Sequence, residues 1–140
     1  MLEDYRKVNR FRVPFSDVDM LRHVNNTAYA RWAEVLRSEY FIDVLGGDIA
    51  GSCGMILAKM EIIYERPMVY RERVAAGCRV SRIGTKSFDF TCEVWSEDRT
   101  LRCARIACVM VAMDHDTGTT VEVPASWRER IAAFDAGIAA

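Results

Sequence analysis

The stretch FSDVDMLRHVNNTAYARWAE, residues 15–34, decides how this chain folds. Its first half follows Pro14, is polar and has no regular period, so it predicts a loop. Its second half repeats large apolar side chains at helical spacing. Asn25 or Asn26 stands at the boundary, where a side-chain carbonyl can accept from an unsatisfied backbone N–H and cap the helix. The stretch predicts a polar loop that leads directly into the start of a helix.

The helix is predicted to continue beyond this stretch, over residues 26–45. Its apolar side chains form one stripe at helical spacing: Tyr29, Trp32, Ala33, Leu36, Tyr40 and Val44. The residues expected on the other, polar side are Arg31, Glu34, Arg37 and Ser38, and Gly46-Gly47 ends the helix. A helix of this length extends about 30 Å, which is enough to cross a small domain.

Strand patterns occur on both sides of this helix in the sequence. Residues 5–13 alternate apolar and basic side chains and predict a half-exposed strand. Four more strands are predicted at 55–65, 72–83, 87–97 and 101–113, followed by a short helix at 124–136. The second half of 101–113 is apolar on both faces, which is typical of a strand inside a sheet. The order predicts an α+β fold in which a long central helix lies across an antiparallel sheet of about five strands.

The composition is that of a single globular domain, residues 1–140. Hydrophobic residues make up 51% and charged residues 28%, which argues against disorder. The net charge of −1 disfavours a general nucleic-acid or anionic-membrane binder. The longest apolar run, 107–113, is too short to span a bilayer, and MLEDYRKVNR has no apolar secretion core. We therefore expect a cytoplasmic protein with no nucleic-acid or membrane partner.

The cysteines and histidines form no metal pattern. There are five cysteines and two histidines, and no CxxC occurs. An odd cysteine count without metal spacing favours buried, reduced thiols. We expect neither a metal nor a redox cofactor.

The residues that could carry chemistry gather in the polar loop. Asp17, Asp19, His23 and two asparagines directly precede a helix start. Backbone N–H groups there are unsatisfied and can hold a developing oxyanion. A carboxylate beside them can act as a base or nucleophile on a bound carbonyl. The alternative is a structural loop whose polar groups only satisfy backbone donors.

This stretch resembles the motif of the hotdog-fold acyl thioesterases, both the 4-hydroxybenzoyl-CoA thioesterase-like branch and the plant acyl-ACP thioesterases. The shared residues are Asp17, Asp19, His23, Val24, Asn25, Asn26, Tyr29, Trp32 and Glu34. Weaker similarity extends over residues 59–95. The resemblance implies a central helix wrapped by an antiparallel sheet, in dimers or tetramers.

The resemblance also implies roles for single residues. Asp19 takes the position of the catalytic carboxylate, with Asp17 as its competitor and Glu61 and Glu65 as lesser candidates. His23 matches a histidine of the acyl-ACP enzymes.

The helix start is implied to bind the substrate. Asn26 and the amides of Thr27 and Ala28 lie where the oxyanion hole is expected, and Asn25 belongs to the same substrate-binding segment.

Two further features bear on the substrate. The acyl-ACP enzymes carry an Asn two residues after the catalytic Asp, where this chain has Leu21. Arg79, Arg82 and Lys86 surround a strand turn that often meets the nucleotide in relatives, so they are candidate contacts for the phosphates of the carrier.

The sequence thus predicts an acyl-CoA or acyl-ACP thioesterase, with coenzyme A or phosphopantetheine present only as part of the substrate. The alternative is an acyl-thioester-binding protein that does not hydrolyse. One helix on one sheet leaves a sheet face or edge uncovered, so a homodimer or homotetramer is expected.

Overall fold

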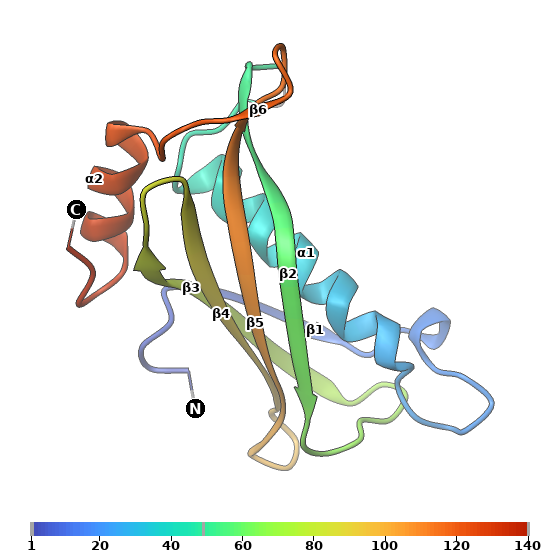
Figure 1. Cartoon of the computed structure of the whole chain (residues 1–140). Helices are drawn as coiled ribbons and strands as arrows, with labels where there is room; N and C mark the ends of the chain where they lie inside the picture. The colour runs from blue at the N-terminus through green and yellow to red at the C-terminus, as the bar shows by residue number, and fades with distance from the viewer. Residues whose placement is uncertain (1, 49, 140) are drawn as a thin grey trace.

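The computed structural model describes residues 2–48 and 50–139. Strand β1 (Lys7–Arg12) leads through the short helix η1 (Phe15–Asp17) and a loop to the long helix α1 (Asn26–Asp43). Four long strands follow: β2 (Cys53–Tyr64), β3 (Arg73–Ile83), β4 (Ser87–Ser96) and β5 (Leu101–Asp114). The two-residue β6 (Thr119–Thr120) and helix α2 (Ala125–Phe134) complete the order, which is α+β as predicted (Figure 1).

The sheet is antiparallel throughout, in the order β1-β3-β4-β5-β2, with β6 paired to the end of β5. Strand β2 pairs with β5, the last long strand, rather than with β3, which follows it in sequence. Among the described elements, β1 and β2 are therefore the two edges of the sheet.

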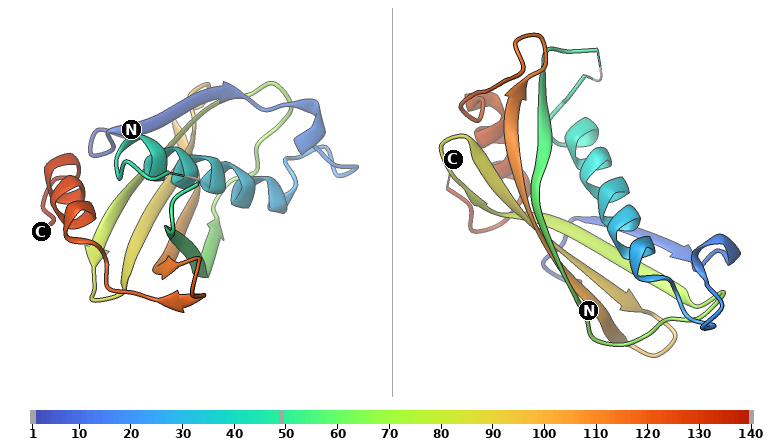
Figure 2. Two further views of the ribbon diagram at one scale, coloured as in Figure 1. Left: turned by 90° about the horizontal axis from the view of Figure 1, so that it is seen from above. Right: turned by 45° about the vertical axis from the view of Figure 1, so that its right-hand side comes forward.

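Helix α1 lies across one face of the sheet (Figures 1 and 2). It begins at Asn26, as predicted, and its apolar stripe is buried against side chains such as Val80, Phe90 and Cys108. Burial of this stripe stabilises the helix. The expectation that Arg37 lies on the polar side is wrong: it is buried, and its guanidinium donates to the Cys108 Sγ at 3.4 Å. In the part of the chain that the structure describes, no helix is long and apolar enough to cross a membrane.

The prediction that residues 101–113 form a strand inside the sheet is confirmed, although only one face of the second half of β5 is buried. Cys108, Met110 and Ala112 are buried towards α1, but Ala107 is exposed and Val109 is only half-buried. Strand β5 is an interior strand because β4 and β2 pair with its two edges, while no helix of the described residues covers its outer face. Hydrogen bonding to two neighbours does not require burial on both faces.

Helix α2 lies beside the far end of β3 and the start of β4 (Figure 1). The Arg128 guanidinium donates to the Thr85 carbonyl at 3.2 Å, and the Trp127 and Phe88 rings lie 6.1 Å apart. Beyond its end, the buried Asp135 carboxylate accepts from the Tyr40 hydroxyl at 2.6 Å and the Val80 N–H at 2.9 Å. Asp135 thus ties α1 and β3 to the C-terminal segment, at the point where the register of β3 shifts.

Candidate active site

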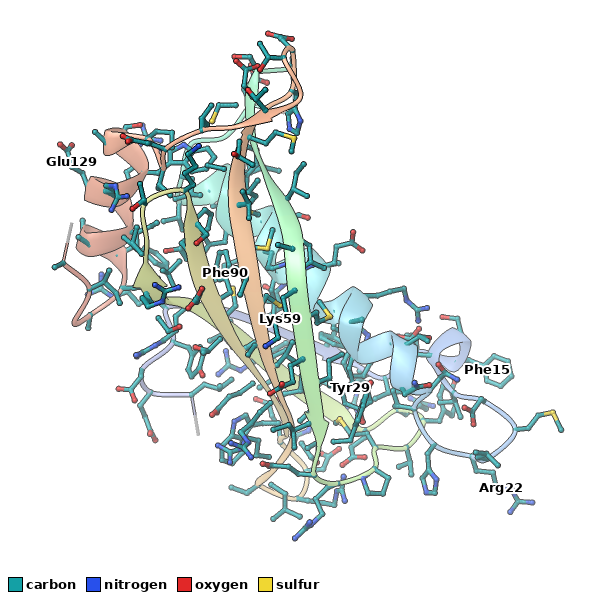
Figure 3. All side chains as sticks on the ribbon, in the orientation of Figure 1. Phe15, Arg22, Tyr29, Lys59, Phe90 and Glu129 are labelled. Atoms are coloured by element: carbon teal, nitrogen blue, oxygen red, sulfur yellow. The ribbon has the colours of Figure 1, made fainter. Side chains whose placement is uncertain are left out.

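The loop before α1 is a closed hairpin-like turn. Val18 and Val24 form an isolated antiparallel bridge, and the Asp19 N–H donates to the His23 carbonyl at 3.2 Å. Arg22 adopts a positive φ of 65°, which lets the chain reverse at the tip. Figure 3 shows Arg22 at the far point of this loop, directed away from the sheet. The turn therefore places Asp19 and His23 opposite each other, directly before the helix start.

The Asn25 side chain connects the loop to the helix. Its Oδ1 accepts from the Thr27 N–H at 2.9 Å and from the Thr27 hydroxyl at 2.6 Å, which makes Asn25 the N-cap. Two donors on Oδ1 fix the orientation of the amide, so Nδ2 faces Asp19 and donates to its Oδ2 at 2.9 Å. Asn25 and Thr27, predicted as substrate-binding residues, are thus both engaged within the chain.

The Asp19 carboxylate is held in its charged form. The amide of Asn25, then the Leu21 N–H donating to Oδ1 at 2.9 Å, and finally the nearby His23 lower the pKa of Asp19 below its ordinary value. At neutral pH this group is therefore an ionised carboxylate that can accept a proton or attack a carbonyl.

The backbone N–H of Asn26, at the helix start, has no hydrogen-bond partner among the described residues. The Thr27 N–H is taken by Asn25 Oδ1, and the buried Ala28 N–H donates to the Asn25 carbonyl at 3.0 Å. The two amides predicted for the oxyanion hole are therefore already engaged. The Asn26 N–H remains available at the positive end of the helix dipole. The Asn26 side chain is exposed.

His23 lies close enough to Asp19 to act on its charge, but its exposed imidazole makes no hydrogen bond among the described residues. Its backbone carbonyl closes the loop instead. The ring is therefore free to orient water or substrate beside the carboxylate.

Asp17 occupies a different environment from Asp19. It is buried, and its carboxylate accepts from the Arg31 guanidinium and from the Trp32 indole N–H, the latter at 2.9 Å. Its backbone carbonyl accepts from the Asn25 N–H at 2.7 Å. These contacts fasten the loop to α1 and engage both carboxylate oxygens of Asp17.

The three basic residues predicted to contact the phosphates of the substrate lie away from Asp19 within one chain. Arg79 lies on the outer face of the sheet, where it lines a cavity of about 610 Å³, and Arg82 pairs with Asp89 at 2.8 Å. The Lys86 carbonyl accepts from the N–H of Ala112, whose strand partner is Met55, at the end of the sheet opposite to the active-site loop. The structure thus brings Asp19, His23, Asn25, Asn26, Thr27 and Ala28 together and leaves Arg79, Arg82 and Lys86 elsewhere.

The lesser carboxylates also lie away from Asp19. Glu65 is bound by Arg102 at 3.0 Å and by Arg105 at 2.7 Å, and Glu61 lines the cavity on the outer face of the sheet.

Tyr64 belongs to the site but was missed in the sequence. This last residue of β2 donates its hydroxyl to the Asn26 carbonyl at 2.9 Å, and its ring meets that of Tyr29 at 5.3 Å. Strand alternation alone could not reveal this contact, because it depends on how the edge strand passes the helix start.

A second concavity lies at the other end of α1. This pocket, of about 280 Å³, is lined by Ser38, Phe41, Ile42, Asp48, Cys53, Gly54, Met55 and His115. The His115 imidazole lies over Gly54, where an added Cβ would approach its Nε2 to 2.0 Å. Among the described residues, no group of three or more His, Cys, Asp or Glu side chains can hold a metal ion.

The chain belongs to the thioesterase-like superfamily, whose family model matches residues 13–131. Solved structures of similar proteins have the hotdog fold, and the same fold describes this chain. A search of curated proteins found no significant match.

Three solved structures illustrate the similarity. The PA5185 protein of Pseudomonas aeruginosa is 25% identical over 96% of this chain and 95% of its own, with a TM-score of 0.86. A thioesterase from Thermus thermophilus, complexed with coenzyme A and Zn, is 28% identical over 95% and 96%, with a TM-score of 0.83. A thioesterase superfamily protein from Jannaschia sp. CCS1 is 27% identical over 95% and 85%, with a TM-score of 0.86. Family and fold together support thioester hydrolysis as the general activity.

Proposed function

We propose that this protein hydrolyses acyl thioesters of coenzyme A or of a phosphopantetheine-bearing carrier protein, with Asp19 as the reacting carboxylate. The observation that carries the proposal is the juxtaposition of a carboxylate held in its charged form by Asn25 with the unengaged N–H of Asn26. Thioester hydrolysis needs these two elements: a group that delivers the attack, and a donor for the oxyanion that forms. The coenzyme A complex of the Thermus thermophilus relative is consistent with such a substrate.

In the general-base form of the reaction, Asp19 takes a proton from water while the water oxygen bonds to the thioester carbon. The carbonyl electrons move to its oxygen, and the Asn26 N–H donates to that oxyanion. When the intermediate collapses, the C–S bond breaks, and the proton held by Asp19 goes to the leaving thiolate. In the nucleophilic form, Asp19 itself bonds to the carbon, the C–S bond breaks and the thiolate leaves, taking a proton from water. A water molecule then hydrolyses the resulting anhydride, which releases the acid and restores the Asp19 carboxylate.

His23 would orient the water or steady the Asp19 carboxylate. The neighbouring amides of Thr27 and Ala28 would act indirectly, by holding Asn25 and the first turn in place.

The assembly that we propose is a homodimer, or a homotetramer built from it. Strand β2 has a free edge among the described residues, and its exposed side chains include Ile56, Leu57, Ile63 and Tyr64. A long apolar edge strand of this kind pairs readily with another strand. Pairing with a second copy would extend the sheet and cover these residues.

The test is release of free thiol from short, long and aromatic acyl-CoA substrates, with wild type and Asp19→Asn side by side. The Asn keeps the shape of the side chain and removes its charge. If Asp19 serves as the base, kcat should fall roughly 10²- to 10⁴-fold. Unchanged turnover would move the reacting carboxylate to Asp17 or Glu61.

The second candidate function is binding of acyl thioesters without hydrolysis. The exposed Leu21, which stands where the acyl-ACP enzymes carry an amide, offers no polar group and favours this candidate. Stoichiometric binding of acyl-CoA to wild type, with no thiol release from acyl-CoA or acyl carrier proteins, would select it.

A further inference from the structure

Arg22 adopts a backbone conformation that an arginine rarely takes. Its φ of 65° lies in the left-handed region, where glycine is unstrained and a residue with a Cβ is not. The chain could therefore reverse here at a lower free-energy cost with glycine at this position. Strained residues of this kind gather at functional sites. We therefore expect the Arg22 side chain to have a use that offsets the strain.

The strained residue belongs to the same turn as the proposed reacting carboxylate. The Arg22 N–H donates to the Asp19 carbonyl at 3.0 Å, and the Leu21 N–H donates to Asp19 Oδ1 at 2.9 Å. A turn closed in this way keeps the first and fourth Cα atoms within about 7 Å. The Arg22 guanidinium can thus lie no farther from Asp19 than this span plus the length of one arginine side chain.

The Arg22 guanidinium is available to a ligand. It is exposed and makes no hydrogen bond or ion pair with any residue that the structure describes. Figure 3 shows the side chain directed away from the sheet. Two other arginines near this end of the chain are already neutralised, because Arg31 pairs with Asp17 and Arg99 pairs with Glu72. Arg22 is therefore the cation that the turn of Asp19 leaves open to an anion from outside.

The proposed substrates offer one anion at a matching distance. Coenzyme A and carrier proteins share a pantetheine arm that joins the thioester sulfur to a first phosphate. This arm is about as long as four or five extended residues, roughly 13–17 Å. A thioester that reacts at Asp19 thus brings its first phosphate within the reach of Arg22. The guanidinium fits a phosphate because its N–H groups can donate in pairs to two oxygens.

The neighbours of Arg22 suit the rest of the arm. Met20 is 97% exposed and Leu21 is 78% exposed, so the loop tip presents two apolar side chains directly before the guanidinium. The pantetheine arm carries two methyl groups next to its phosphate. An apolar contact beside a cation on the loop tip therefore corresponds to an apolar group beside an anion on the substrate.

We propose that Arg22 binds the first phosphate of the pantetheine arm and thereby sets the affinity for the carrier part of the substrate. This inference rests on the proposed function and deepens it. It gives the phosphate a contact in the chain that supplies Asp19, whereas Arg79, Arg82 and Lys86 lie elsewhere in that chain. Because Arg22 does not touch the thioester carbon, its contribution should appear in KM rather than in kcat.

The test shortens the substrate and the side chain in parallel. Arg22→Gln removes the charge and keeps a residue with a Cβ in the turn. The probes carry the acyl group that wild type hydrolyses fastest, as acyl-CoA, as S-acyl-phosphopantetheine and as S-acyl-pantetheine, which has no phosphate. With the first two probes the KM of Arg22→Gln should rise roughly 5- to 50-fold, while kcat stays close to wild type. With S-acyl-pantetheine the variant and wild type should have the same KM.

Three results would overturn the inference. The first is a KM for acyl-CoA that is the same in Arg22→Gln and wild type. The second is an equal rise with S-acyl-pantetheine, which would mean that Arg22 only maintains the loop. The third is a rise with acyl-CoA but not with S-acyl-phosphopantetheine, which would assign Arg22 to the nucleotide. If wild type hydrolyses none of the probes, the proposed function fails instead. Titration calorimetry with coenzyme A would then still test the phosphate contact, because wild type should bind it more tightly than Arg22→Gln.

A matched control separates the contact from strain and from net charge. Arg71, on the loop between β2 and β3, is also exposed and also left-handed, with a φ of 67°. Arg22→Gly and Arg71→Gly each remove one positive charge and one strained residue, so neither should lower the melting temperature. Only Arg22→Gly should raise the KM for acyl-CoA, and Arg22→Lys should recover part of the affinity. An equal rise in Arg71→Gly would mean that overall charge, not a contact at Arg22, holds the substrate.

Discussion

Asn25 donates from Nδ2 to Oδ2 of Asp19 across 2.9 Å, while its Oδ1 caps helix α1. One amide therefore fixes both the orientation of the carboxylate that we propose as the reacting group and the first turn of the helix that carries the proposed oxyanion donor. Because Thr27 supplies two donors to Oδ1, the amide cannot reverse without losing both. The two halves of the site are held in one geometry before any substrate arrives.

Removal of this amide should change the pH dependence of catalysis. Hydrogen bonding from Asn25 is the largest cause of the lowered pKa of Asp19. In Asn25→Ala the pKa rises, so Asp19 is protonated over a wider acidic range. The acidic limb of kcat/KM against pH should move to higher pH, and activity at pH 5 should fall more than activity at pH 8. Thr27→Val loses only the hydroxyl donor, so its acidic limb should move in the same direction but by a smaller amount. If the acidic limb of kcat/KM stays at the wild-type pH in both variants, this account is contradicted.

The Asn26 N–H can be removed without breaking the helix. Proline is well tolerated at the first helical position, and Asn25 already has the extended backbone that proline requires before it. Asn26→Pro should lower kcat by roughly 10²- to 10³-fold while the melting temperature stays close to wild type. Asn26→Ala keeps the N–H and serves as the control. If Asn26→Pro turns over as fast as Asn26→Ala, the oxyanion donor lies elsewhere.

Asp17 is expected to support stability rather than catalysis. In Asp17→Ala the Trp32 indole N–H and the Arg31 guanidinium lose their carboxylate partner. The buried unpaired donor should cost about 1–3 kcal/mol in the free energy of unfolding, measured by urea denaturation. Turnover per folded molecule should stay close to wild type below the transition. A loss as large as that of Asp19→Asn would return Asp17 to the catalytic role.

Tyr40 and Asp135 should be energetically coupled. Both are buried, and the Tyr40 hydroxyl donates to Asp135 Oδ2 at 2.6 Å, so burial, then this contact, raises the pKa of Tyr40. Tyr40→Phe and Asp135→Ala should each destabilise the fold. In a double-mutant cycle the coupling should be about 0.5–3 kcal/mol. Additive effects of the two changes would mean that the contact contributes nothing to the attachment of the C-terminal segment.

Much of the fold could be predicted because its cause is local. The apolar stripe from Tyr29 to Tyr40 requires a helix buried along one side, and the alternation in residues 87–97 requires a strand with one face inward. The start of α1 at Asn26 followed from the chemistry of a capping side chain. The residues that form each of these patterns lie close together in the chain, so the patterns can be recognised from the sequence alone.

The sequence by itself therefore determined the elements, the polar loop and the identity of Asp19 as a candidate base. Only the tertiary structure decided that the backbone N–H groups of Thr27 and Ala28 are engaged, that the backbone N–H of Asn26 has no partner in the described part of the chain, and that Tyr64 reaches the helix start. It also decided that β2 pairs with β5, which leaves β2 as an edge. For the Tyr64–Asn26 contact and the β2–β5 pair, the physical reason is that the partners lie far apart in the chain, so the packing of the whole domain decides which groups meet. For Thr27 and Ala28 the partner is the nearby Asn25, and the sequence left both Asn25 and Asn26 as possible caps, so only the folded backbone decided which one forms the contacts.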